Sequence, residues 1–315
     1  MRFYTQTHAY YCGVDLHART MYLCLLDAQG KTLLHQNLPT SPDAFLQAIA
    51  PFRDGLVVGC ECMFAWYWLA DLCAAEKIAF VLGHALYMKA IHGGKAKNDK
   101  LDAAKIAGLL RGGLFPQAYV YPAAMRETRD LLRSRTYLVN ERAHLLAHVQ
   151  NTNSQYNLPA FDFRLSRPSA RINDTIVSRF SHPSLRLSIQ TNLELIDILD
   201  DKINTLERHL RKYAKVDDAV SYQLLQTIPG VGKLLALILL YEIHDTHRFD
   251  NVGQFLSYAR LVTPRHESAG KVTGHGNKKM GNAHLRWAFA EAALLLLRDC
   301  EPVKRWRQRI EKKKG

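Results

Sequence analysis

Four carboxylates in the first third of the chain have the chemistry and the spacing of a divalent metal site. Asp15 and Glu61 each end an apolar run that predicts a strand, and Asp99 and Asp102 stand three residues apart where a helical pattern begins. Residues three apart on a helix share one face. Oxygen ligands gathered from separate elements suit Mg²⁺, and two such ions can hold a phosphodiester in line for displacement. The carboxylates therefore predict phosphoryl transfer on a nucleic acid.

Each of these carboxylates also has a purely structural interpretation. Asp15 could be a turn residue at a strand end, Asp99 a helix N-cap, and Asp102 a first-turn residue favoured by the helix dipole. Glu61 is harder to explain in this way, because a glutamate between two cysteines at the end of a buried strand needs a cation or a donor. We interpret all four as metal ligands and expect His17, close to the first aspartate, to have an orienting role.

The elements that must position these side chains predict a mixed α/β sheet. Alternating or apolar runs indicate strands at residues 9–15, 20–27, 32–37, 56–62 and 78–82. Ser41 followed by Pro42 indicates the start of a helix, as N-cap and first helical residue. Further helical patterns occupy residues 64–76, 84–91 and 100–111. Three hairpin-type strands followed by strands that alternate with helices are typical of a mixed sheet.

Two long helical patterns follow, near residues 126–157 and 185–213, and an irregular segment rich in Arg, Ser and Pro joins them. Their leucine-rich faces predict an antiparallel or intermolecular coiled hairpin. Further along, we expect a loop rich in Gly, Lys and Asn over residues 272–282, a helix near 283–298, and a basic tail from Lys304 to Lys314.

The sequence Ile-Pro-Gly-Val-Gly-Lys at residues 228–233 lies between two helical patterns, as in a helix-hairpin-helix. Gly230 and Gly232 would expose backbone N–H groups at a helix N-terminus, where a phosphate can bind beside Lys233. A tight turn that joins two core helices is the alternative interpretation.

The net charge of +13 is unevenly distributed along the 315 residues. Residues 1–125 carry +2, residues 126–215 carry +5 and residues 216–315 carry +6, and we expect these ranges to be three domains. The excess of positive charge predicts that the last two bind a polyanion. No apolar run reaches about 18 residues, so no membrane span is expected. The six cysteines are interpreted as reduced thiols of a cytoplasmic protein.

Taken together, these motifs resemble the DEDD transposases of bacterial insertion sequences, relatives of the Piv site-specific DNA invertase, some of which are guided by a bridge RNA. In the first part, the resemblance rests on Val14-Asp15-Leu16-His17, on Glu61 and on the segment from Asp99 to Leu110. In the last part it rests on Ile228-Pro229-Gly230-Val231-Gly232, Glu242-Ile243-x-Asp245-x-x-x-Phe249, Phe255-x-x-Tyr258-Ala259-x-Leu261, Ser268-Ala269-Gly270-Lys271 and Gly281-Asn282-x-x-Leu285-Arg286. The motifs occur in order and cover nearly the whole chain.

The resemblance implies an RNase H-like (RuvC-like) mixed sheet in residues 1–125, a long coiled connector in residues 126–215, and a small, mainly helical transposase domain in residues 216–315. It implies Mg²⁺ as the cofactor, as two ions for which Mn²⁺ can substitute, held by Asp15, Glu61, Asp99 and Asp102. Ser268 would be the nucleophile and form a transient covalent bond to DNA. Many relatives carry a serine directly before the glycine of this motif, whereas this chain has Ala269 there and its serine one position earlier.

The partners implied are donor and target DNA, a guide RNA and further copies of the chain. Dimers would pair into a tetramer, so that the acidic domain of one subunit meets the serine domain of another, in a cytoplasmic protein associated with the nucleoid. Four basic residues are predicted to contact phosphate, although an ordinary basic loop would have the same composition: Lys271, Lys278, Lys279 and Arg286.

Two other functions stay open at this point. A metal-dependent nuclease similar to Holliday-junction resolvases would use activated water and no covalent serine. A nucleic-acid-binding protein with a decayed catalytic site would lack a carboxylate, and none of the four is missing.

Overall fold

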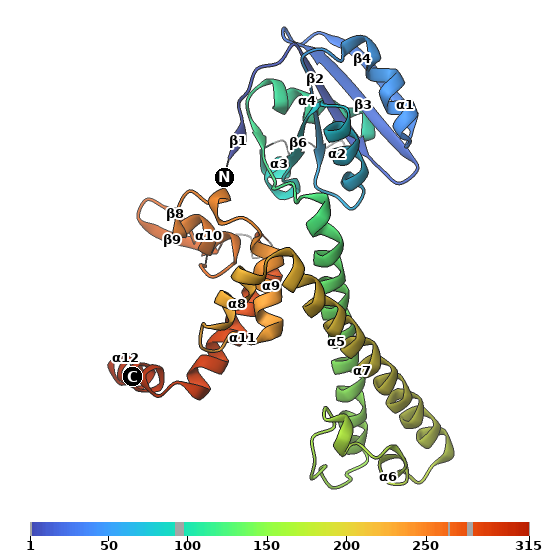
Figure 1. The fold of residues 1–315 in the computed structure, drawn as a ribbon, viewed down its shortest axis with the longest axis vertical. Coiled ribbons are helices and arrows are strands. Elements are labelled where there is room, and N and C mark those ends of the chain that lie inside the picture. Colours follow the sequence, from blue (N-terminus) through green and yellow to red (C-terminus); the bar gives the residue numbers. More distant parts are fainter. Residues whose placement is uncertain (1, 92–97, 264, 276–279, 315) are drawn as a thin grey trace. The chain divides into compact units, whose positions relative to one another are not determined.

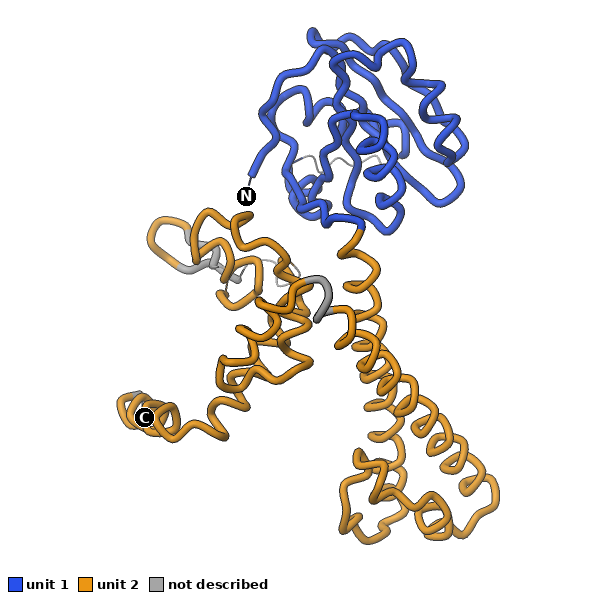
Figure 2. The backbone as a smooth tube through the Cα atoms, in the orientation of Figure 1, with its two compact units in different colours: residues 1–123 blue, residues 124–315 orange. Residues whose placement is uncertain are grey.

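The computed structural model describes residues 2–314, apart from residues 92–97, 264 and 276–279 (Figure 1). Contacts divide the chain into two units, residues 1–123 and residues 124–315 (Figure 2). Among the helices that the structure describes, none is long and apolar enough to cross a membrane.

Unit 1 is built on a five-stranded mixed sheet in the order β4-β3-β2-β5-β6. Its strands are β2 (Tyr10–Leu16), β3 (Thr20–Asp27), β4 (Thr32–Pro39), β5 (Leu56–Glu61) and β6 (Ala79–Gly83). The first three pair antiparallel, whereas β2 with β5 and β5 with β6 pair parallel. The mixed sheet and its five strands confirm the prediction to within two residues at each end. The pairing of β1 (Phe3–Tyr4) with β7 (Phe115–Pro116) was not predicted.

Helices cover both faces of this sheet. On one face, α1 (Pro42–Ile49) and α2 (Trp66–Ala75) bury Phe45 and Leu69 against Val14 of β2. On the other face, α4 (Asp99–Arg111) buries Ile106 and Leu110 in a separate cluster. The short helix α3 (Ala85–Ile91) adds to this second cluster, and the 3-10 turn η1 (Ala50–Phe52) follows α1. Ser41 caps α1 through its side chain and Pro42 opens the helix, as the sequence predicted.

Helix α4 lies directly on the backbone of the sheet because two glycines face it. Gly13 of β2 and Gly59 of β5 are partners in the parallel register. A Cβ on Gly13 would stand 2.2 Å from the Ala103 carbonyl oxygen and 2.4 Å from the Ala107 nitrogen, both in the α4 backbone. A Cβ on Gly59 would meet the Leu110 side chain at 2.6 Å. A methyl group on Gly13 would push the α4 backbone away from β2, whereas one on Gly59 would displace the Leu110 side chain.

We expect Gly13→Ala to lower the free energy of unfolding by about 3 kcal/mol, because overpacking against a helix backbone cannot be relieved by a side-chain rotation. Gly108→Ala is the matched control in α4 itself, since a Cβ there meets nothing within 4 Å. The control should stabilise the protein by about 0.5–1 kcal/mol, as expected for Gly to Ala within a helix. Urea denaturation of both variants measures the difference, and equal stabilities would contradict the close packing.

Unit 2 begins with a long antiparallel helical hairpin made by α5 (Ala123–Gln155) and α7 (Pro183–Asp217). Leu132 of α5 shares a buried cluster with Leu210 of α7, and Val149 shares another with Ile189, so the helices run in opposite directions. The segment between them contains η2 (Pro168–Ala170) and α6 (Asn173–Val177).

Buried ion pairs hold this hairpin in register. Arg135 contacts Glu207 and Arg142 contacts Asp200, each with 2.5 Å between nitrogen and oxygen. Arg171, from the segment between the two helices, is also buried and lies 2.8 Å from Asp200. The arginine-rich middle region therefore uses several of its cations inside the protein, as the sequence composition alone did not reveal.

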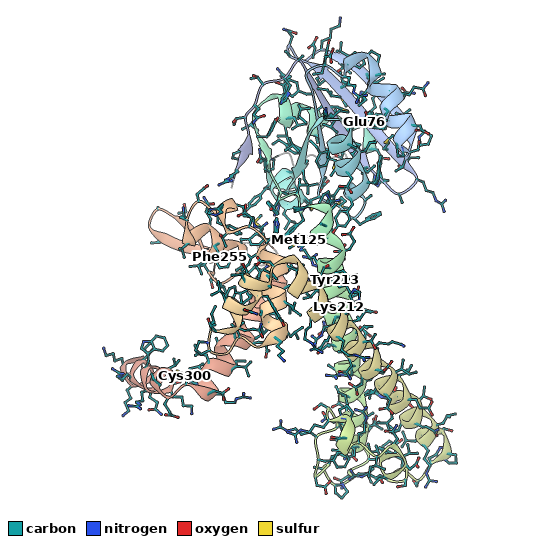
Figure 3. The ribbon with its side chains drawn as sticks, in the orientation of Figure 1. Glu76, Met125, Lys212, Tyr213, Phe255 and Cys300 are labelled. Carbon is teal, nitrogen blue, oxygen red and sulfur yellow. The ribbon has the colours of Figure 1, made fainter. Side chains whose placement is uncertain are left out.

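The remainder of unit 2 is mainly helical. Its elements are α8 (Ala219–Gln226), α9 (Lys233–Ile243), η3 (Thr246–Arg248), α10 (Val252–Tyr258), β8 (Arg265–Ser268), β9 (Lys271–His275), α11 (Ala283–Asp299) and α12 (Glu301–Lys314). Phe255 of α10, labelled in Figure 3, packs edge-on against Phe289 of α11 with ring centroids 5.8 Å apart. Met125, at the start of α5, reaches the same core.

One prediction for this region was wrong. The expected loop over residues 272–282 contains strand β9, which extends to His275, because it pairs with β8 as a hairpin. The predicted basic tail lies in helix α12, and its charges explain why it is helical. Lys304 pairs with Glu301 at 2.6 Å and Arg307 with Glu311 at 2.7 Å, at spacings that stabilise a helix.

Candidate active site and metal centre

The side chains of Asp15 and Glu61 lie on the face of the sheet that α4 covers. Asp15 and Glu61 come two residues after Gly13 and Gly59, and side chains alternate along a strand, so each carboxylate shares the face of its glycine. Both stand at the carboxyl ends of neighbouring parallel strands, where open α/β sheets commonly bind ligands. Gly13 and Gly59, which allow α4 to lie close to the sheet, therefore also bring the carboxylates close to that helix.

The first turn of α4 supplies the other two carboxylates. The side-chain oxygen of Asn98 caps the helix by accepting from the Leu101 amide at 2.8 Å, and Asp99 and Asp102 follow in the first turn. Asn98, rather than Asp99, is therefore the N-cap, which removes the structural explanation offered for Asp99. A second contact holds this turn, because His35 of β4 lies 3.0 Å from the Lys100 carbonyl oxygen.

The structure brings Asp15, His17 and Asp99 together. One ligand atom from each lies within 4.8 Å of the others, and no second group of this kind occurs among the residues described. The His17 Nε2 atom stands between the two carboxylates, 3.3 Å from Asp15 and 3.7 Å from Asp99. Glu61 lies outside this group, and Asp102 contacts the Lys105 amine at 3.0 Å.

The electrostatics of this group favour a cation. Burial raises the pKa of Asp15 above its usual range, and the neighbouring charges of Asp99 and Asp102 raise it further, while His17 opposes the shift. A half-buried carboxylate beside two others is unfavourable without a positive partner. The donor set that comes together, two carboxylates and one imidazole, can hold a divalent metal ion. The residues present therefore fit divalent metal use, as the resemblance implied.

We expect Asp15→Asn to stabilise the metal-free protein at neutral pH. A carboxyl whose pKa is raised in the folded state costs stability above its ordinary pKa and regains it as the pH falls, so a neutral amide removes that cost. Mg²⁺ at 100 times its dissociation constant should stabilise the parent protein by about 2.7 kcal/mol and the variant much less. Thermal melts with EDTA or Mg²⁺ measure both effects, with the exposed Asp43→Asn as control. Equal Mg²⁺ stabilisation of all three proteins would place the metal elsewhere.

Ser268 lies in unit 2, at the tip of the β8–β9 hairpin. It pairs with Lys271 across a two-residue turn, and Ala269 and Gly270 in that turn have φ values of 50° and 74°. The left-handed conformation suits glycine but costs about 1–2 kcal/mol for alanine. Ser268 and Lys271 are both exposed, so the hydroxyl and a cation stand side by side where a large substrate can reach them.

The segment that carries Ser268 is closed at its base. The backbone N–H of Asn282 donates to the Tyr258 carbonyl oxygen at 2.6 Å, and the Arg260 Nε donates to the Gly281 carbonyl oxygen at 3.0 Å. These bonds join Tyr258 and Arg260 to Gly281 and Asn282. Asn282 also caps α11 by accepting from the Leu285 amide at 3.1 Å.

Glu242 of α9 lies beneath this base and is almost fully buried. Its carboxylate accepts from Arg133 at 2.8 Å, from Arg129 at 3.0 Å and from the Asn282 side chain at 2.7 Å. Burial alone would raise the pKa of Glu242, but the hydrogen bonds and charges of the two arginines and Asn282 lower it to about 2. One carboxylate therefore joins α5, α9 and the start of α11.

The sequence did not identify the Glu242 cluster as an ion network. Glu242 and Asn282 belong to quoted motifs, but nothing in their spacing links them to arginines more than 100 residues away. The available signal was an acidic residue at the end of the strongly apolar run Leu234–Tyr241, which needs a buried partner.

The predicted phosphate contacts are placed as follows. Gly230 packs against α11, because a Cβ there would lie 2.3 Å from the Ala292 carbonyl oxygen, and this supports the tight-turn alternative at that residue. Gly232 caps α9 with open space around it, and Lys233 begins that helix. Lys271 and Arg286 are exposed. Lys278 and Lys279 lie outside the described residues.

Two family models match separate parts of the chain. A family model described as a transposase, and named for DEDD and IS110, matches residues 12–157, which include all four carboxylates. A second model, described as transposase IS116/IS110/IS902 family, matches residues 222–310, which include Ser268.

Curated relatives carry the same description. The transposase for insertion sequence element IS1111A of Coxiella burnetii is 25% identical over 295 residues, covering 91% of this chain and 77% of that protein. The transposase for insertion sequence element IS1328 of Yersinia enterocolitica is 28% identical over 209 residues, covering 65% of this chain and 60% of that protein. The y4qE protein of Sinorhizobium fredii is 28% identical over 210 residues, covering 64% of this chain and 48% of its own length.

An acidic cluster on a mixed sheet, joined to a helical second unit, is here the framework of a transposase, an enzyme that acts on DNA. The chain belongs to the IS116/IS110/IS902 family of transposases, and its function is DNA transposition.

Proposed function

We propose that this transposase cuts and rejoins DNA strands with Mg²⁺ held by Asp15, Glu61, Asp99 and Asp102, and with Ser268 as the nucleophile. The observation that carries the proposal is the approach of Asp15, His17 and Asp99 to within 4.8 Å, at the point where α4 meets the ends of two parallel strands. Glu61 ends the second of these strands and Asp102 lies one helical turn along, so both can complete the ligand set.

When bound there, Mg²⁺ would neutralise charge on the scissile phosphate and favour loss of the serine proton. Within the chain, His17 orients Asp15 and Asp99, and Lys105 holds one oxygen of Asp102. Lys271 stands beside Ser268 and would contact the same phosphate. These roles assign every charged group of the site to metal binding, to orientation or to phosphate contact.

The chemistry proposed is two transfers of one phosphoryl group. The Ser268 oxygen forms a bond to phosphorus as the bond from phosphorus to the adjoining nucleotide oxygen breaks, and the serine proton leaves while the released hydroxyl gains one. Rejoining reverses this step with the hydroxyl of another strand. A serine hydroxyl is a weak nucleophile near neutral pH, so activation by a nearby metal or base is required.

We extend the proposal to architecture and partners. The strand order β4-β3-β2-β5-β6, with three antiparallel and two parallel strands, supports an RNase H-like assignment of the first unit. Residues 126–215 would act as a helical connector and residues 216–315 as the serine-bearing domain, with a helix-hairpin-helix at α8 and α9. An oligomer would combine carboxylates of one subunit with Ser268 of another, and a bridge RNA would select the DNA sites of this nucleoid-associated, cytoplasmic protein.

The test of the proposal is a strand-transfer assay with the full chain and a plasmid that carries the element ends. We expect cleavage with Mg²⁺ or Mn²⁺, none with EDTA, and a protein–DNA adduct that survives denaturation. Asp99→Asn should remove cleavage, while the exposed Asp43→Asn should not. Metal-dependent cleavage without any adduct would support the nuclease alternative instead.

The guide is tested separately, by sequencing RNA that co-purifies with the protein from cells that carry the element. One discrete short RNA encoded beside the gene is expected. Random RNA, or none, would overturn RNA guidance and leave a transposase that reads DNA directly.

A further inference from the structure

We infer that helix α12 binds an unpaired strand of DNA, with Trp306 stacked on a base and a row of cations along the adjoining phosphates. This surface extends the proposed function, and it depends on the DNA substrate of the family but not on the serine chemistry. The last three residues of α12 that the structure describes in full, Glu311 to Lys313, also lie beyond the matched family model.

The first observation is the exposure of Trp306. Its side chain is 59% exposed, although a tryptophan normally buries most of its surface. Trp306 lines a hollow together with Arg309, Ile310, Lys312 and Lys313. Ile310, one turn further along, is half-buried, so apolar and basic side chains line the same hollow. An indole placed in this way offers a flat apolar surface to a partner that brings negative charge with it.

The second observation is the sorting of charge around the helix. At about 100° per residue, Arg305, Arg309, Lys312 and Lys313 fall within an arc of about 120° on one flank of Trp306. All four are exposed. The ion pair of Glu311 with Arg307 lies on the opposite side of the helix, and Glu301 pairs with Lys304 at the edge of the cationic arc, four residues before Arg305. Within the described part of the chain, the flank beside Trp306 has no carboxylate paired to its cations.

Aromatic and basic side chains interleaved on one surface match single-stranded nucleic acid. Every base has a face that can stack on an indole, and the neighbouring phosphates lie within reach of long cationic side chains. Duplex DNA offers the same phosphates but keeps its bases stacked inside, so Trp306 would add little to duplex binding. Because strands must separate where DNA is cut and exchanged, an unpaired strand is a substrate that this enzyme meets.

The test is fluorescence anisotropy of the full-length protein with a labelled 20-nucleotide DNA strand, its duplex, and the RNA strand of the same sequence. We expect Trp306→Ala to weaken binding of the DNA strand about tenfold and to leave duplex binding within about twofold. The double variant Arg309→Gln with Lys313→Gln should reduce the slope of log Kobs against log salt concentration by about 1.4. This is the change expected when two phosphate contacts on a single strand are lost. Lys304→Gln with Arg307→Gln is the control for lost charge on the opposite side, and should change the strand affinity far less.

Each other outcome overturns the inference. Equal losses for strand and duplex would reduce α12 to a general electrostatic contact. A loss confined to the RNA strand would assign the surface to RNA, and an altered oligomeric state of Trp306→Ala would assign it to another copy of the chain. Because Ser268→Ala should bind the labelled strand normally, failure of the covalent chemistry and failure of this surface are distinguishable.

Discussion

Ser268→Ala is expected to abolish the covalent protein–DNA adduct and to reduce strand exchange by about a thousandfold or more, because alanine lacks the hydroxyl that would bond to phosphorus. Stability should change little, since Ser268 is exposed at the tip of a hairpin. The carboxylates lie in a different unit, so Mg²⁺ should stabilise the variant as it stabilises the parent. Adduct formation on denaturing gels and thermal melts with Mg²⁺ measure the two properties independently.

The neighbouring alanine allows a sharper version of this experiment. Many relatives carry their serine at the position of Ala269, so the pair Ser268→Ala and Ala269→Ser moves the hydroxyl to that place. If Ser268 is the nucleophile, Ala269→Ser alone keeps activity and the double variant does not regain it. Recovery in the double variant would show that the hydroxyl acts from position 269, and full cleavage by Ser268→Ala alone would favour activated water.

Glu242→Ala is expected to destabilise unit 2 by about 3–5 kcal/mol, because it removes the buried carboxylate that the buried Arg129 and the partly exposed Arg133 share. It also removes an acceptor from Asn282, which closes the base of the Ser268 segment. Urea denaturation followed by circular dichroism measures the loss. The control is Glu141→Ala on α5, where the side chain is 43% exposed and the change should be below about 0.5 kcal/mol.

The free energy of unfolding at acid pH provides a second test of the Glu242 cluster. Since the pKa of Glu242 is lowered to about 2 in the folded protein, its stabilisation is complete above its ordinary pKa and is lost as the pH falls from there toward about 2. Glu242→Gln should therefore flatten the fall in stability over that range. An unchanged fall in stability would mean that other carboxylates control acid unfolding.

The sheet and the long helices were predictable because the apolar residues of each element recur at the spacing typical of a strand or a helix. Strands such as Thr20–Asp27 alternate or are wholly apolar, and Ser41 and Asn98 are ordinary caps. The carboxylates could be proposed as metal ligands because each stands at an element end. What the sequence could not show was distance: Gly13 and Gly59 are far apart along the chain, and only the parallel register places them side by side under α4.

Strand β9 was not predicted because its residues are polar and glycine-rich, as in a loop, and only its pairing with the neighbouring β8 makes it a strand. The roles of two charged residues escaped prediction because their partners are distant in sequence. Arg171 looked like one more surface cation, yet it is buried against Asp200 on another helix. The role of Glu242 depends on arginines that precede it by more than 100 residues.

The unbroken course of α5 limits how the helical hairpin can change during evolution. This helix of 33 residues, about 50 Å long, binds Glu242 through Arg133 and Asp200 through Arg142. One residue inserted between those arginines would turn one cluster by about 100° relative to the other, so that both could not form. An insertion of seven residues returns the two clusters to within about 20° of their original relative rotation, provided that α7 gains the same length. The hairpin can therefore lengthen or shorten only by steps that restore this relative rotation, such as about seven or eleven residues, taken in both helices at once, if both clusters are to persist.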